Sequence, residues 1–309
     1  MSVIDIHVHA FPDKIAGAAI NKLQGKSHTR PFTDGTVAGL AASMKEAGID
    51  FSVLQPVATN PAKVIHVNDS AIGINERGAE TGIFSFGCMH PDFEGWHDEL
   101  SRVAAAGLKG IKLHPVYQGV DIDDIRYLRI LSRAGELGLI VLIHAGWDVS
   151  FPGPENARAN PKQILSAIRS AGPVTLILAH MGGWRCWEEA GELLNGTGAY
   201  IDTAFAIGYM TSNGDGHYKS REELAMLSDD SAVRIMRRFG VNRVLFGTDS
   251  PWSSQTDTLR SVQSLPLTED EKAAILHGNA AGLLNISRRQ CCGSILQQSS
   301  RRSIIPRSP

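Results

Sequence analysis

The sequence lacks most features of secreted and membrane proteins. Only four of its 309 residues are cysteine, at positions 88, 186, 291 and 292, and their spacing matches neither a zinc ribbon nor a disulfide framework. No apolar run reaches the roughly 18–20 residues of a membrane span, and the chain begins with a strand pattern instead of a secretory leader. We therefore expect a cytoplasmic protein without membrane association.

An excess of positive charge is also missing. The formal net charge is −2, and 43% of the residues are hydrophobic, which indicates a globular chain without the basic field that nucleic-acid binding needs. A small molecule is the expected partner. Only residues 287–309 depart from this composition, because they contain five arginines and no acidic residue. We predict one domain over residues 1–286 and a disordered basic tail over 287–309.

Short β-rich segments alternate with helical patterns along the domain. Eight strands are predicted, at residues 3–10, 51–58, 83–91, 108–116, 139–146, 174–183, 199–206 and 243–252. This alternation is typical of a single α/β domain folded as a (β/α)₈ TIM barrel, with a doubly wound open sheet as the alternative. The first strand is not followed by a Gly-rich phosphate-binding turn.

Polar residues gather at the carboxyl ends of the predicted strands. They are His7 and His9, His90, His114, His144, His180 and Asp249. Active sites of such barrels lie at the C-terminal ends of the strands, so we expect these side chains to share one site there. The other five histidines fall in predicted loops or helices and are interpreted as surface residues.

The first strand contains two histidines separated by one residue. Side chains alternate along a strand, so His7 and His9 point the same way and lie about 6–7 Å apart. Both imidazoles could bind one ion, and Asp5 on the same face could orient one of them or bind water deeper in the fold. The alternative is a strand with two hydrogen-bonded histidines and no metal.

Imidazole and carboxylate are the donors that divalent metals such as zinc take in catalytic sites. A bound ion would supply activated water at neutral pH, with a nearby His or Asp as proton acceptor. Other nucleophiles are not evident: the sequence has no G-x-S-x-G elbow, and Cys88 lies within a strand without an activating partner.

The segments DIHVHAFPDKI, GIKLHP, HAG, LAHMGGW and FGTDSPW occur in this order. Together they resemble the amidohydrolase superfamily, and within it the amidohydrolase-related branch that includes aminocarboxymuconate semialdehyde decarboxylase. The resemblance extends over residues 1 to about 285. It implies that His7, His9, His144 and Asp249 bind one divalent ion, zinc or else manganese. It also implies that His180 polarises the attacking water or the substrate.

Four residues are candidates for binding substrate. Lys112 shares a face with His114; some superfamily members carboxylate a lysine on this strand to bridge two metals, but Lys112 lies one layer below His114. We therefore interpret Lys112 as structural or substrate-facing and His114 as lining the site. Arg185 could bind a carboxylate, although the muconate enzyme has its arginine about eleven residues after the sixth-strand histidine, where this chain has Gly191. Trp147 could stack on a flat substrate or pack at the barrel rim.

The predicted function is metal-dependent hydrolysis, in which activated water attacks an amide, ester or lactone carbonyl. His180 would act as base or as electrophilic stabiliser. The alternative enzyme is a metal-dependent carboxy-lyase that removes CO₂ from a small carboxylic acid. A barrel that binds metal or ligand without catalysis is the third hypothesis. Members of the branch that this sequence resembles often form dimers, so a homodimer is expected.

Overall fold

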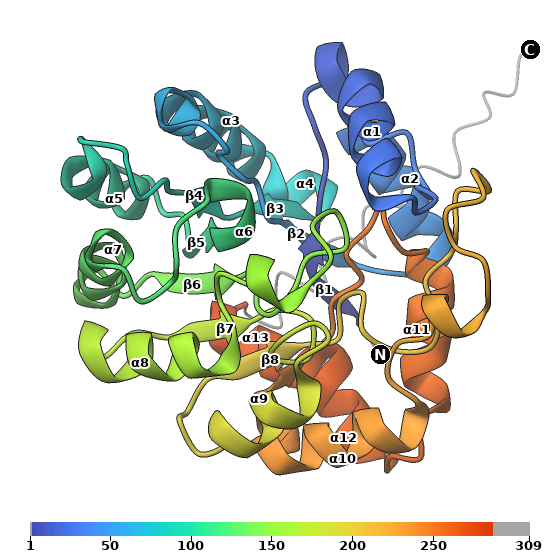
Figure 1. Ribbon diagram of the computed structural model, residues 1–309. Helices are drawn as coiled ribbons and strands as arrows, with labels where there is room; N and C mark the ends of the chain where they lie inside the picture. The colour runs from blue at the N-terminus through green and yellow to red at the C-terminus, as the bar shows by residue number, and fades with distance from the viewer. Residues whose placement is uncertain (1, 287–309) are drawn as a thin grey trace, which may run out of the picture.

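The computed structural model describes residues 2–286 and has a closed parallel barrel at its centre (Figure 1). The predicted basic tail, 287–309, lies outside the described residues. The strands are β1 Ile4–Val8, β2 Phe51–Leu54, β3 Ile83–Ser85, β4 Gly87–Cys88, β5 Gly110–Leu113, β6 Ile140–Ile143, β7 Leu176–Leu178, β8 Tyr200–Asp202 and β9 Val244–Leu245. Every strand except β3 pairs in parallel with the next one along the chain, which gives the orders β1-β2-β3 and β4-β5-β6-β7-β8-β9.

Hydrogen bonds at two seams close these strands into a barrel of eight. Only Phe86 separates β3 from β4, and the N–H of Phe86 donates to Leu54 O at 2.9 Å. The two short segments therefore count as one strand of the barrel. At the second seam, Ile6 N–H donates to Phe246 O at 3.0 Å and Asp249 N–H donates to His7 O at 2.7 Å. The predicted (β/α)₈ TIM barrel is therefore confirmed.

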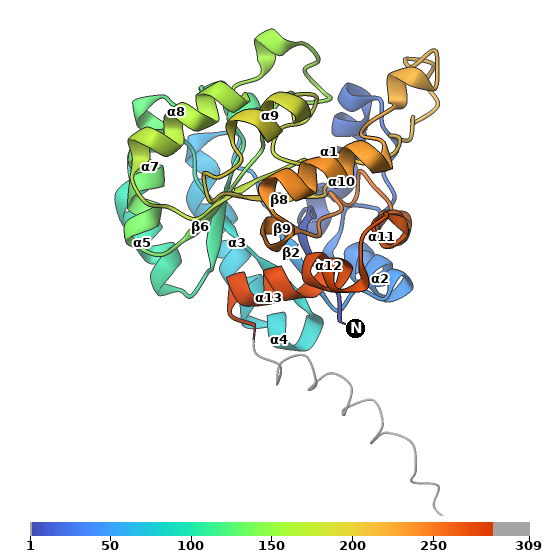
Figure 2. The same ribbon diagram turned by 90° about the horizontal axis from the view of Figure 1, so that it is seen from below.

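The helices surround the strands on the outside (Figures 1 and 2). The longer ones are α1 Asp13–Ser27, α2 Val37–Ala47, α3 Val64–Glu76, α5 Trp96–Ala105, α7 Ile125–Glu136, α8 Pro161–Ala171, α10 Asp229–Phe239 and α11 Gln255–Ser264. Shorter ones are α4 Gly78–Thr81, α6 Pro115–Gln118, α9 Trp187–Leu193, α12 Glu269–Ala273, the π-turn η5 Ala274–Gly278 and α13 Asn279–Leu284. No helix in the described part of the chain has both the length and the apolar character required to cross a bilayer.

Apolar strands explain why the barrel is buried on both faces. The four residues of β6, Ile-Val-Leu-Ile, are all buried, as expected for a parallel strand between a barrel interior and a helix layer. Helix α13 contacts β1 and β9, and its Ala280 and Leu284 pack with Ile4 and Leu245. The long connections after β6 and β8 pack against each other, since Trp147 and Val149 contact a small buried cluster that contains Phe205 and Met210.

Candidate metal centre

Histidine and aspartate side chains converge at the carboxyl ends of the strands. Three groups have potential ligand atoms within 4.8 Å of one another: His7, His9 and Asp249; His7, His180 and Asp202; and His114, His144 and Asp148. All predicted ligands occur in these groups, but His144 lies in a different group from the other three. His90 belongs to none of these groups, and its Nδ1 accepts a hydrogen bond from Asp92 N at 3.1 Å.

The first group connects the first strand of the barrel with the segment that follows the last strand. Asp249 Oδ1 lies 3.0 Å from His9 Nε2 and 3.4 Å from His7 Nε2. The backbone of Asp249 has a φ of 64°, which is uncommon for a non-glycine residue and often marks a functional position. Burial raises the pKa of Asp249, but the hydrogen bond from His9 and the neighbouring positive charges outweigh it, and the net pKa is lowered. A charged carboxylate is the form that binds a cation.

Asp5 stabilises the backbone turn that precedes Asp249. Its carboxylate accepts hydrogen bonds from Thr248 N at 3.0 Å, Thr248 Oγ1 at 2.7 Å and Gln255 Nε2 at 2.8 Å. Its only bond to His7 is from the main-chain N–H, at 3.2 Å. Asp5 therefore holds the turn that carries Asp249 and does not orient a ligand imidazole, which was one of its two predicted roles.

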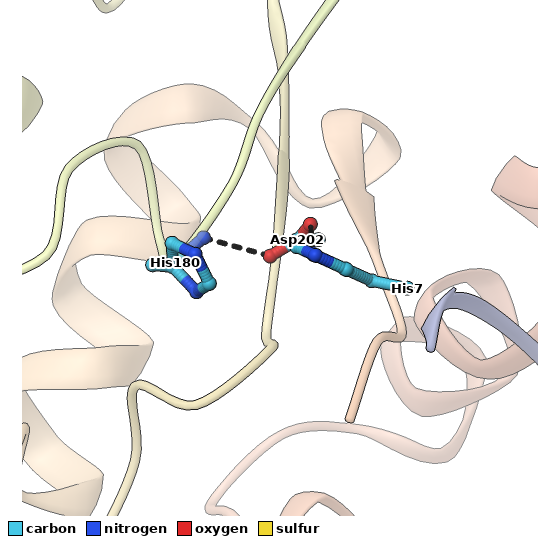
Figure 3. A group of neighbouring side chains, drawn as sticks. All are labelled: His7, His180 and Asp202. Atoms are coloured by element: carbon cyan, nitrogen blue, oxygen red, sulfur yellow. Dashed lines mark hydrogen bonds and ion pairs between the residues drawn. The ribbon is translucent and has the colours of Figure 1, made fainter. Parts of the chain in front are cut away.

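Asp202 orients His7, and sequence reasoning missed it. Its Oδ2 accepts from His7 Nδ1 at 2.8 Å, and its Oδ1 accepts from the main-chain N–H groups of His180 at 2.8 Å and Ala204 at 3.1 Å (Figure 3). With the proton on Nδ1, the lone pair of His7 Nε2 is directed at the centre. Burial raises the pKa of Asp202, while these hydrogen bonds and Lys112 oppose the rise. Asp202 lies within the predicted strand 199–206, whereas the observed strand β8 ends at this residue.

His144 and His180 face each other in an arrangement that suits a cation. His180 Nδ1 lies 2.9 Å from Ala204 O, and His144 Nε2 lies 2.9 Å from Trp147 O. A carbonyl oxygen only accepts, so each of these nitrogens bears the proton of a neutral ring. The other two, His180 Nε2 and His144 Nδ1, are 3.0 Å apart and both present lone pairs. Two facing lone pairs repel each other, and a positive charge bound beside them would relieve this repulsion.

Both rings are neutral at ordinary pH. Burial lowers the pKa of His180 to about 4, although Asp249 opposes the shift. Burial, followed by the charges of His180 and Lys112, places the pKa of His144 well below its usual value. Neutral imidazole is the form that binds metals, so the donor set of this centre fits a divalent ion.

Lys112 reaches the centre from below. Its Nζ lies 3.2 Å from His7 Nε2, because its long side chain spans the layer that separates it from the histidines. The backbone of Lys112 thus lies below the histidines, but its ammonium group reaches the level of their ring nitrogens. Burial lowers the pKa of this ammonium, while the surrounding aspartates oppose the shift.

The third group is better suited to polar lining than to metal binding. The rings of His114 and His144 are stacked with centroids 4.1 Å apart and planes inclined by 14°. Because imidazole lone pairs lie in the ring plane, nearly parallel rings direct them side by side instead of at one ion. Asp148 Oδ2 lies 3.6 Å from His114 Nε2 and 3.7 Å from His144 Nε2. At these distances a water molecule or a substrate hydroxyl could bridge the carboxylate and the imidazoles. Asp148 was not predicted, although it follows His144 by four residues.

Trp147 and Arg185 lie apart from the ligands. Both line a surface cavity of about 540 Å³, none of whose lining residues belongs to the three groups. Trp147 connects the two regions, since its carbonyl bonds His144 and its side chain lines the cavity. Of the four predicted substrate-binding residues, Lys112 and His114 are thus at the centre and Trp147 and Arg185 are beside it.

Solved structures of similar fold are numerous, at low sequence identity. A TIM-barrel protein of Bordetella bronchiseptica has a TM-score of 0.70 and 14% identity, over 92% of this chain and 99% of that one. A candidate 2-pyrone-4,6-dicarboxylic acid hydrolase of Pseudomonas putida has a TM-score of 0.60 and 17% identity, over 92% and 97%. For 5-carboxyvanillate decarboxylase of Sphingomonas paucimobilis the values are 0.59 and 15%, over 93% and 99%.

The names of these relatives include both chemistries that were predicted, hydrolysis and decarboxylation. No curated protein matches the sequence of the chain. A sequence model of the family described as Amidohydrolase matches residues 4–286, which include every residue of the three groups. The chain therefore belongs to the amidohydrolase family, and its histidine and aspartate groups support a divalent metal.

Proposed function

We propose that the protein is a metal-dependent hydrolase that adds water to an amide, ester or lactone carbonyl of a small molecule. The observation that carries the proposal is the position of His180. Its Nδ1 is bonded to Ala204 O, so its unprotonated Nε2 faces the other donors of the centre. A neutral imidazole fixed in this way beside a metal-ligand group is suited to general base catalysis.

The ion would be held by His7, His9 and Asp249, with His144 as the fourth ligand. Zinc is the proposed metal and manganese the second choice, because three imidazoles and one carboxylate suit both. A divalent ion at this position supplies Lewis acidity, which polarises an oxygen atom and favours loss of a proton from water.

His180 would then transfer the proton. Its Nε2 accepts a proton from the attacking water and returns it to the leaving group. During this time Nδ1 keeps its hydrogen bond to Ala204 O, which stabilises the imidazolium form. Asp202 bonds the main-chain N–H of the same residue and so fixes the ring relative to His7.

The charges at the centre are balanced in a way that suits either a neutral or an anionic substrate. Asp148, Asp202 and Asp249 place three carboxyl groups around the histidines, and no arginine side chain forms an ion pair with them among residues 2–286. Burial raises the pKa of Asp148 to about 6 and that of Asp202 to about 7, and a divalent ion would offset the remaining negative charge. Lys112 favours the alternative, a metal-dependent carboxy-lyase, because its buried ammonium could hold a substrate carboxylate.

The test combines metal content with a substrate panel. We expect about one zinc or manganese ion per chain by mass spectrometry in the wild type, and a strong loss in Asp249→Ala, since one of four ligands is removed. Asp215→Ala is the control, because Asp215 also pairs with a histidine, His28, but is exposed. Two ions per chain would assign Lys112 to a bridging position, and no bound metal after reconstitution would refute the mechanism.

Turnover then separates the two chemistries. The loaded protein should hydrolyse lactones or esters and lose this activity in His180→Asn. Turnover restricted to substrates with a free carboxylate, with release of CO₂, would instead establish the carboxy-lyase. A cytoplasmic location and a homodimer remain proposals, and light scattering after size exclusion tests the second.

A further inference from the structure

The cavity beside the metal centre has an unusual charge balance. Its charged walls are Lys162, Arg185, Glu188 and Glu189. Glu188 is paired with Arg234 and Arg238, and Lys162 lies 3.6 Å from Glu189. Arg185 is left without a carboxylate partner within residues 2–286, so the cavity has one uncompensated positive charge.

Arg185 is held in place by aromatic rings. Its guanidinium carbon lies 4.8 Å from the ring centroid of Trp184 and 5.8 Å from that of Trp187. Its one hydrogen bond runs from NH2 to Glu223 O at 3.3 Å, which leaves most of its five N–H donors free. The backbone of Arg185 has a φ of 61°, a conformation that an arginine adopts at a cost.

The other walls are flat and apolar. Trp147 and Trp187 contribute indole rings, and Ala157 and Leu227 contribute buried aliphatic groups. A guanidinium fork binds a carboxylate through two parallel hydrogen bonds, and indole faces stack on planar groups. The volume of about 540 Å³ lies within the range of small-molecule sites.

We propose that this cavity binds a planar carboxylate, with the carboxylate on Arg185 and the planar part against Trp147 and Trp187. The site is separate from the metal ligands. Trp147 lies between the two, because its carbonyl oxygen is bonded to His144 Nε2 at 2.9 Å. The chemical class of the ligand is an aromatic or conjugated acid, which need not be the molecule that is hydrolysed.

Benzoate is the probe, and the uncharged benzamide is its matched control. Titration with benzoate up to about 10 mM, a range that covers fragment affinities, should quench tryptophan fluorescence in a saturable way. Benzamide should bind at least roughly tenfold more weakly, because it lacks the charge-assisted bonds. Equal quenching by both compounds, or none by benzoate, would refute the proposal.

Two variants separate Arg185 from a general charge effect. Arg185→Met keeps an apolar stem of similar length and should raise the Kd for benzoate by roughly tenfold or more. Arg221→Met should leave the Kd unchanged, since Arg221 also lies over an aromatic ring, that of Tyr209 at 4.3 Å, but does not line the cavity. Unchanged affinity in Arg185→Met contradicts the assignment.

A measurement on the wild type locates the site even if the variant fails to fold. Cys186 lines the cavity, so benzoate should slow its alkylation by N-ethylmaleimide, followed by peptide mass spectrometry. Buried Cys88 is the internal control and should show no benzoate effect. Binding that disappears when the metal is removed by chelation would place benzoate at the metal centre instead. Because no readout depends on turnover, this proposal and the proposed hydrolase function can fail separately.

Discussion

At the scale of single residues, the function of the centre depends on which nitrogen of each histidine holds the proton. Asp202, Ala204 O and Trp147 O each fix one ring nitrogen and thereby direct the other nitrogen inward. A substitution at one of these partners can change the donor set without touching a ligand.

Asp202→Asn tests this control. The asparagine oxygen would keep the two backbone N–H bonds, so its amide nitrogen would face His7 Nδ1 and force the proton to Nε2. Metal affinity should fall about 10- to 100-fold, measured by competition with a chelator of known affinity. Asp215→Asn changes an exposed aspartate paired with His28 at 2.7 Å and should have no effect. Equal affinity of wild type and Asp202→Asn would show that the His7 tautomer is not set by Asp202.

At the scale of secondary-structure elements, the connection after β6 and the connection after β7 approach each other closely at one glycine. Gly146 follows β6 with a φ of 84°, and a Cβ at this position would clash with the main-chain N and O of Trp184. This close approach brings the loop that contains Trp147 against the loop that contains Arg185.

Gly146→Ala should therefore destabilise the protein by more than Gly107→Ala. Gly107 has the same φ of 84° but open space around it, so its substitution costs only the backbone strain of about 1 kcal/mol. We expect at least about 2 kcal/mol for Gly146→Ala, because main-chain atoms must also shift. Urea unfolding measures both values, and equal losses would exclude the steric contribution.

Helix α7 provides a prediction about pH. Asp124 is its N-cap and accepts from Arg126 N at 2.9 Å and from Arg126 Nε at 2.9 Å. These bonds to Arg126 lower the pKa of Asp124 to about 2. A lowered pKa in the folded state means that the stabilisation is complete above the unfolded pKa of about 4 and is lost as the pH falls towards 2.

Asp124→Ala should accordingly lower the free energy of unfolding by about 1 kcal/mol at pH 7. The difference from the wild type should shrink between about pH 4 and pH 2, because the wild-type carboxylate becomes protonated there. Urea titrations across this pH range measure it. Asp123→Ala is the neighbouring control and should show little change. A difference that persists at pH 2 would argue against a charged cap.

At the scale of the whole molecule, much of the fold follows from local pattern. Apolar strands such as β6 alternate with amphipathic helices. This alternation can be recognised from residues that are close together in the sequence. The positions of His7, His9 and Asp249 follow from the barrel, because strand ends meet at one rim.

Other features of the centre depend on contacts that no local pattern specifies. Asp202 was missed because its partner His7 lies on another strand. Asp148 has one distant neighbour, His114, and one local neighbour, His144, so only part of its environment could be read from the sequence. The contact between Lys112 Nζ and His7 Nε2 depends on a side chain long enough to span one layer of the barrel interior. The separation of Trp147 and Arg185 from the ligands depends on how two loops turn after their strands.

A metal that binds only the folded barrel should stabilise the whole molecule. Chelation should lower the Tm, and readdition of zinc should restore it; at a free concentration near 1,000 times Kd the stabilisation is about 4 kcal/mol. Differential scanning fluorimetry measures the shift. Asp249→Ala is the control, because its Tm should respond little to either treatment. An unchanged wild-type Tm would mean that the metal contributes nothing to stability.

The seam between the first and last strands has a further consequence for how the protein is made. His7 and His9 are synthesised well before Asp249, which is added 240 residues after His9. At about 5–20 residues per second, the two histidines wait roughly 12–48 s for their carboxylate partner. The proposed ligand set is therefore complete only after the last strand of the barrel has been synthesised, so we expect a nascent chain to bind the metal late.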